Sequence, residues 1–88
     1  MSKLPDPIFA TQLGETLAFF RGQMGVSQAA IAARSGITQP ALCNYEKGRR
    51  VPSVDRFGAL AVALEVDAAD LLALVTQRVS AARLEAVA

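Results

Sequence analysis

Apolar side chains recur every three or four positions in the first part of the chain, which is the spacing of one face of an α-helix. Five of them are separated by steps of 4, 4, 3 and 4: Phe9, Leu13, Leu17, Phe20 and Met24. Asp6 precedes a proline, and this pair is typical of an N-cap followed by the first helical residue. Gly25 is a stop signal. The pattern predicts a helix over residues 7–24.

Two short helices are predicted next, each from a capping residue and a terminating glycine. Ser27 begins an alanine-rich helix that ends before Gly36. Thr38 begins a third helix that ends at Gly48. Pro40 lies in the first turn of this helix, where an N–H would be unpaired in any case.

The second half of the chain predicts two further helices. Ser53 caps a fourth helix, whose inward-facing residues are expected to be Val54, Phe57, Leu60, Ala61 and Leu64. Asp67, with Asp70 three residues later, resembles a capping box that opens a fifth helix. The sequence has no sustained alternation of apolar and polar residues, so strands are not expected. The predicted fold class is all-α, with five helices.

Composition narrows the class of protein. A length of 88 residues fits a single domain, residues 1–88, and an apolar content of 52% argues against a disordered chain. The longest apolar run, residues 57–64, is far below the roughly 18 residues that suggest a membrane span, and no secretory signal follows Lys3. The single cysteine, Cys43, fits a reducing compartment. We therefore expect a cytoplasmic protein without a membrane segment.

The same composition removes much catalytic chemistry. Without histidine there is no imidazole base and no imidazole metal ligand, and one cysteine cannot build a zinc site. No GxxxxGK[ST] or GxGxxG phosphate-binding motif is present. We expect neither enzymatic activity nor a metal or cofactor.

Charge is distributed unevenly along the chain. Residues 21–56 contain six Lys or Arg and two Asp or Glu residues, which gives this segment a net charge of +4, whereas the rest of the chain has a net charge of −3. A basic middle with acidic flanks suits a surface that meets a polyanion, although charge alone also fits ordinary solvated helices.

Residues 25–48 combine these features in one motif. Two capped helices of about eight residues, joined by a turn that contains a glycine, have helix-turn-helix geometry. The segments GVSQAAIA and SGITQ resemble the Cro and phage-repressor type of helix-turn-helix, the XRE family, and so do the residues that follow them, Leu42, Tyr45, Glu46 and Gly48. The resemblance also takes in Leu13, Gly14 and Arg21 upstream and the Leu71–Leu72 pair downstream, about three quarters of the chain.

Several residues depart from the family pattern. Ala18 and Ala30 stand where the family often has arginine and glutamate. Glu65 replaces the usual glycine after the fourth helix, so either a non-glycine residue adopts the left-handed conformation or the cap differs. Pro40 and Cys43 stand on the third helix where polar residues are common, which removes hydrogen-bonding groups there.

The resemblance implies a lambda-repressor-like fold whose third helix, residues 38–47, enters the major groove of double-stranded DNA. The base-contacting candidates are its outward-facing residues, namely Gln39, Pro40, Ala41, Cys43 and Asn44. A side-chain amide such as that of Gln39 or Asn44 can pair with adenine N6 and N7 together, unless it is simply solvated. Pro40, Ala41 and Cys43 offer contact with a thymine methyl.

Phosphate contacts are expected from helix N-termini and from the basic loop after the third helix. The candidates are Gln28, Thr38, Lys47, Arg49 and Arg50, although Thr38 also has a capping role and the loop cations fit a solvated surface. The family pattern further implies an ion pair between Arg21 and Glu46 that ties the first helix to the end of the third.

The C-terminal segment, residues 73–88, extends the helix beyond the predicted core of residues 7–72. Six residues step by 4, 3, 4, 3 and 4, an a/d seam: Ala68, Leu72, Val75, Val79, Ala82 and Ala86. One interpretation is a dimer seam centred on Leu72, Val75, Val79 and Ala82. The alternative is that the seam packs on its own domain or frays.

The sequence thus predicts a small DNA-binding transcriptional regulator, a repressor or autoregulator, that binds a pseudo-palindromic operator as a homodimer. The alternative is a protein-interaction module of the same fold, such as an antitoxin or a bridging factor. Gln39 and Asn44 suit bases, whereas Pro40 and Ala41 also suit a protein surface.

Overall fold

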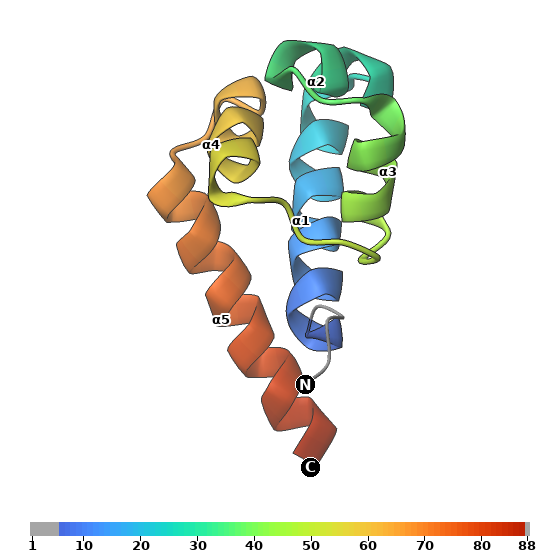
Figure 1. The fold of residues 1–88 in the computed structure, drawn as a ribbon. Coiled ribbons are helices and arrows are strands. Elements are labelled where there is room, and N and C mark those ends of the chain that lie inside the picture. The colour runs from blue at the N-terminus through green and yellow to red at the C-terminus, as the bar shows by residue number, and fades with distance from the viewer. Residues whose placement is uncertain (1–5, 88) are drawn as a thin grey trace.

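The computed structural model describes residues 6–87, which form five α-helices and contain no strand. The helices are α1 (Pro7–Met24), α2 (Gln28–Ser35), α3 (Gln39–Glu46), α4 (Val54–Ala63) and α5 (Ala68–Val87) (Figure 1). The all-α class and the five predicted helices are confirmed.

The helices begin where the capping residues predict. The side chain of each predicted N-cap accepts a hydrogen bond from a backbone N–H in the first turn, as Ser27 does from Ala30 at 3.1 Å and Ser53 does from Arg56 at 3.3 Å. The same holds for Asp6, Thr38 and Asp67. These bonds satisfy N–H groups that the helix itself leaves unpaired.

The end of α4 uses a conformation that is unusual for its residue. Glu65 has φ 59°, so a non-glycine residue takes the left-handed position where the family usually has glycine. The N–H of Val66 donates to the carbonyl of Ala61 at 3.0 Å and closes the end of the helix. Of the two outcomes expected at Glu65, the structure has the left-handed one.

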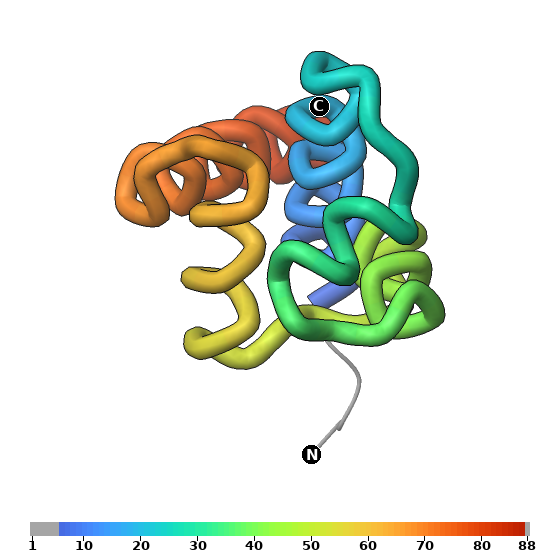
Figure 2. The backbone as a smooth tube through the Cα atoms, turned by 90° about the horizontal axis from the view of Figure 1, so that it is seen from above, coloured from blue at the N-terminus to red at the C-terminus, as the bar shows by residue number. Residues whose placement is uncertain are grey.

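Helix α1 is the central element of the fold. It packs against α3 on one side and α5 on the other, while α2 packs against α3 and α4 (Figures 1 and 2). The core is formed by side chains from all five helices, among them Leu13, Leu17, Ile31, Leu42, Leu60 and Leu71. The helix-turn-helix pair is therefore fixed to the domain through the inward faces of both its helices.

Gly14 sets the distance between α1 and the end of α3. A Cβ atom at this position would lie 2.4 Å from the carbonyl oxygen of Tyr45 and 2.6 Å from that of Glu46, closer than real side chains approach. The absence of a side chain at residue 14 therefore allows the backbone of α3 to rest directly on α1.

The predicted dimer seam is wrong at its centre. Val75 and Val79 are 0% and 8% exposed and belong to the core of the same chain, so they are not available to a partner. Their apolar face is covered by α1, which matches the alternative that the seam packs on its own domain. Of the other seam residues, Leu72 is 45% exposed and Ala82 is half-buried. The core thus continues beyond residue 72, and Ala88 lies outside the described residues.

Polar contacts hold the second half of α5 on α1. The Arg78 guanidinium donates to Gln12 Oε1 at 3.1 Å and to Thr16 Oγ1 at 3.3 Å, and it lies 3.5 Å from Glu15 Oε1. Farther along α5, Arg83 pairs with the carboxylate of Asp6 at the start of α1. These contacts explain why the end of α5 lies beside the start of α1 in Figure 1.

Candidate nucleic-acid interface

The turn between α2 and α3 brings the two helices of the motif together. Gly36 adopts φ 72°, and the next N–H, that of Ile37, donates to the carbonyl of Ala32 at 3.0 Å. Ala32 is 3% exposed, and its small side chain allows close packing at the crossing. Ile37 in this turn is half-buried and packs against the core.

Helix α3 has one buried face and one open face. Leu42 and Tyr45 are 1% and 4% exposed and point into the core. Gln39 and Pro40 are exposed, whereas Cys43 and Asn44 are half-buried at the border of the open face. The open face therefore includes four of the five predicted base-contacting residues.

Ala41 differs from the prediction that it faces outward. It is half-buried and packs against the core. The reason is its helical position, because Ala41 precedes Tyr45 by one turn and so shares the edge of the inward face. Only part of its methyl group is accessible.

The predicted ion pair between Arg21 and Glu46 is confirmed and is bidentate. Arg21 Nε donates to Glu46 Oε2 at 2.8 Å, and Nη2 donates to Oε1 at 2.9 Å. The two side chains are 23% and 7% exposed. The hydrogen-bonded carboxylate raises the pKa of Arg21 above its ordinary value. The pair fixes the C-terminal end of α3 to α1.

The same carboxylate also contacts α2, which the sequence does not predict. Gln28 Nε2 donates to Glu46 Oε1 at 2.9 Å. Arg21 Nη1 donates to the carbonyl of Val26 at 2.9 Å, on the other side of the N-cap. The side chain of Gln28, the first residue of α2, is therefore held in place by Glu46.

The loop after α3 carries the predicted cations on its outside. Lys47, Arg49 and Arg50 are exposed. Gly48, with φ 72°, lies so close to α1 that a Cβ would approach the Cα of Thr11 to 3.2 Å. The loop backbone thus turns against α1, and the three cationic side chains remain in solvent.

Arg56 is a further cation beside α3 and the last residue of the basic segment 21–56. It is exposed in the first turn of α4, and its Nη1 donates to the hydroxyl of Tyr45 at 2.9 Å. The charge count indicates such a residue, whereas its contact with Tyr45 depends on how α3 and α4 pack.

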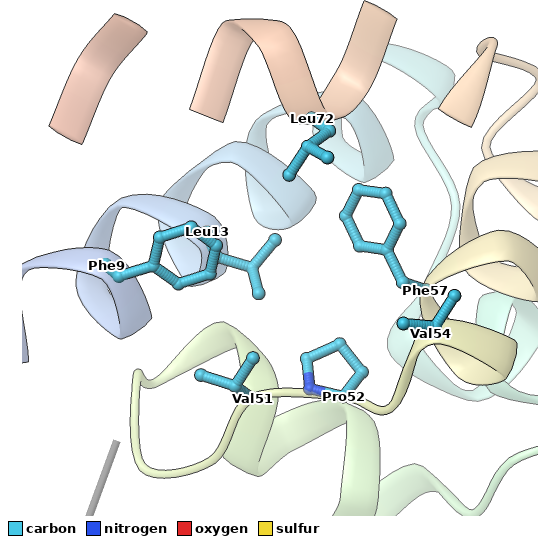
Figure 3. A pocket seen from close by; sticks show the side chains of 7 residues that line it. All are labelled: Phe9, Leu13, Val51, Pro52, Val54, Phe57 and Leu72. Carbon is cyan, nitrogen blue, oxygen red and sulfur yellow. The ribbon is translucent and has the colours of Figure 1, made fainter. Parts of the chain in front are cut away.

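An apolar groove lies next to the loop between α3 and α4 and has a volume of about 200 Å³. Side chains from α1, the loop, α4 and α5 converge on it in Figure 3: Phe9, Leu13, Val51, Pro52, Val54, Phe57 and Leu72. Val54 is 88% exposed, which corrects the prediction that it faces the interior. As the first residue of α4, it lies beyond the edge of the core at the rim of the groove.

Among residues 6–87, none of the helices combines the length and the apolar composition that a membrane span needs. No cluster of three or more His, Cys, Asp or Glu side chains in the same range could hold a metal ion.

Known proteins share both the sequence pattern and the fold. A family model described as a helix-turn-helix domain matches residues 12–74. An uncharacterized HTH-type transcriptional regulator of Sinorhizobium fredii, y4dJ, is 38% identical over 60 residues, which cover 68% of this chain and 78% of the relative.

Two solved structures extend the likeness to three dimensions. The clp gene regulator ClgR of Corynebacterium glutamicum superposes with a TM-score of 0.81 at 26% identity, over 92% of this chain and 86% of ClgR. The restriction-modification controller protein C.AhdI of Aeromonas hydrophila gives 0.68 at 29% identity, over 70% of this chain and 94% of C.AhdI. The resemblance to XRE-type regulators is confirmed, and the chain belongs to the helix-turn-helix domain family of DNA-binding transcriptional regulators.

Proposed function

We propose that this protein binds a specific double-stranded DNA site by placing α3 in the major groove. The observation that carries the proposal is the open face of α3, with exposed Gln39 at its start and the exposed cations of the following loop beside it. An uncovered polar helix face next to cations matches the way a recognition helix meets base edges and phosphates.

In this arrangement Gln39 and Asn44 read bases through their amides, each suited to adenine N6 and N7. Pro40, Cys43 and the accessible part of Ala41 provide apolar contact with thymine methyl groups. The half-buried positions of Cys43 and Asn44 give them less reach than Gln39. Gln39 is therefore the leading base-contacting residue.

Phosphate contacts come from both sides of α3. The N-terminus of α2, with Gln28, and the cap of α3, with Thr38, offer donors and a positive helix end. At the other end of α3, the exposed side chains of Lys47, Arg49 and Arg50 contact the phosphates of the DNA backbone. Five phosphate contacts from one copy give a slope of log K against log salt of about −4 to −5 for each half-site, and a dimer on two half-sites about twice that.

The regulatory role that fits best is that of a repressor or autoregulator. A protein that occupies its operator blocks other proteins from the same DNA, and this requires no more than the DNA-binding surface proposed here. The likeness to the structures of a gene regulator and of a restriction-modification controller supports a role in the control of transcription.

We also propose that the protein binds as a two-fold homodimer, with the second copy packed on the apolar groove. Val54, Leu72 and Val51 expose apolar surface at its rim, 88%, 45% and 38% respectively. Arg50 and Asp55, both exposed, flank Val51 and Val54 in the chain with opposite charges, which suits an isologous contact. Recognition helices about 34 Å apart would then read half-sites of a pseudo-palindrome about 10 base pairs apart.

The proposed function is tested by selecting duplexes from a random pool with the purified protein and then measuring affinity at several salt concentrations. We expect one enriched sequence and the slope given above. Binding that is absent at low salt, or that does not change with salt, would contradict DNA binding and favour the protein-interaction module.

A further inference from the structure

Glu46 joins three helices through a single carboxylate. Its oxygens accept two hydrogen bonds from Arg21 on α1 and one from Gln28 Nε2 on α2, while its own backbone ends α3. The side chain is only 7% exposed, so solvent cannot replace these donors freely. Such a carboxylate holds its partners in one geometry.

The partners of this carboxylate enclose the start of α2. Arg21 Nη1 holds the carbonyl of Val26, the residue before the N-cap, and Glu46 holds the side chain of Gln28, the residue after it. Ser27 accepts from the N–H groups of Ala30 and Ile31. Within residues 6–87, the first backbone N–H groups of α2 are left for an outside acceptor.

The amide of Gln28 has two N–H donors and one acceptor oxygen, and Glu46 uses one donor. No hydrogen bond within residues 6–87 uses the second N–H, which is therefore free to donate to an outside acceptor. A glutamine side chain that is not held samples many rotamers and loses that freedom when it binds. Because the hydrogen bond to Glu46 already restricts the Gln28 side chain in the free protein, less conformational entropy is lost when DNA binds.

We propose that Glu46 is a positioning residue for DNA binding, which orients the Gln28 amide so that it and the N-terminus of α2 grip one phosphate. The inference rests on the proposed function and adds a residue that does not itself touch DNA. The competing interpretation is that Glu46 only stabilises the fold through Arg21.

A double-mutant cycle on operator affinity separates the two interpretations. The variants are Glu46→Gln, Gln28→Ala and the double variant, measured at a temperature where circular dichroism shows each fully folded. We expect Glu46→Gln to weaken binding about tenfold in the parent and less than twofold in the Gln28→Ala background. Equal losses in both backgrounds would overturn the proposal.

A second measurement locates the effect on the DNA. Each operator phosphate is replaced in turn by an uncharged methylphosphonate. The parent should lose affinity most at the phosphate beside α2, and Glu46→Gln should be less sensitive there but unchanged at phosphates beside Arg49. A uniform change over all phosphates would overturn the positioning role.

The unsubstituted protein provides a test that does not depend on the folding of variants. NMR relaxation of the Gln28 side-chain amide, without DNA, should give an order parameter near the value of about 0.85 seen for rigid backbone. A value below about 0.6 would mean that Glu46 does not hold the amide, and would overturn the inference. Failure of the parent to bind any duplex would instead overturn the proposed function.

Discussion

At the scale of single residues, Gln39 and Arg50 are expected to contribute to DNA binding in different ways. Gln39→Ala should lose about 1–3 kcal/mol on the specific site and relax the choice of base at one position. Arg50→Ala should weaken all sequences alike and reduce the salt slope by about one for each half-site. Affinities for the selected site and for random duplex, measured at several salt concentrations, check both. Equal losses of Gln39→Ala on the two duplexes would mean that α3 is wrongly placed.

Asp6 provides a residue-scale prediction about pH. Its hydrogen bond from Arg83, followed by one from the N–H of Phe9, lowers the pKa of Asp6 below its ordinary value of 3.8. A lowered pKa stabilises the folded state above pH 3.8, and this contribution is lost as the pH falls through the folded pKa. NMR titration should show the lowered pKa, and Arg83→Gln should move it upward. An unchanged pKa in the variant would exclude Arg83 as the main cause.

The capping residues show what sequence predicts well at this scale. Asp6, Ser27 and Thr38 act on N–H groups two or three residues away, so their role depends on local geometry alone. The hydrogen bond from Gln28 to Glu46 spans 18 residues and exists only because α2 and α3 pack together. Local spacing contains no signal for such a contact.

At the scale of helices, the contact between α1 and α3 predicts a sensitive glycine. Gly14→Ala should destabilise the protein by about 1–3 kcal/mol, because the new methyl group would meet the carbonyls of Tyr45 and Glu46. Gly22→Ala is the matched control in the same helix, since a Cβ there meets nothing within 4 Å. It should stabilise by about 0.5–1 kcal/mol. Thermal or urea unfolding checks the pair, and similar effects at both positions would contradict the close approach.

Helix α5 shows where sequence reasoning fails at the scale of elements. The spacing of Leu72, Val75 and Val79 correctly indicates an apolar face, but spacing cannot tell which surface covers that face. The structure covers Val75 and Val79 with the same chain, and Arg78 adds polar contacts to Gln12 and Thr16. Whether the same chain or a second copy covers the apolar face of α5 depends on how the other helices pack. The spacing of apolar residues along α5 contains no information on that packing.

At the scale of the whole molecule, the fold could be predicted from sequence because several signals agree. Caps, helical periods and the helix-turn-helix spacing all indicate the same five helices. The apolar groove could not be predicted, because it forms where segments distant in sequence meet without filling the space between them. Phe9 from α1 and Leu72 from α5 line it together, although 63 positions separate them.

The groove gives the prediction for assembly. If a second copy packs on it, Val54→Asp should produce a folded monomer, because the side chain is 88% exposed and the aspartate is buried only in the dimer. Leu84→Asp is the matched control, since Leu84 is 70% exposed and does not line the groove. Sedimentation at tens of micromolar, a range near weak-dimer affinities, should show dimers for the parent and the control, with circular dichroism confirming the fold of each.

The consequence for DNA follows from the loss of one half-site. A dimer engages two half-sites, so its second contact is intramolecular and its affinity exceeds that of the monomer by a factor of about 10² or more. Val54→Asp should therefore bind the full operator about as weakly as a single half-site, and the parent should lose this advantage when the half-site spacing is changed by five base pairs. A parent that sediments as a monomer, or a Val54→Asp variant that remains dimeric, would show that the groove is not the dimer contact.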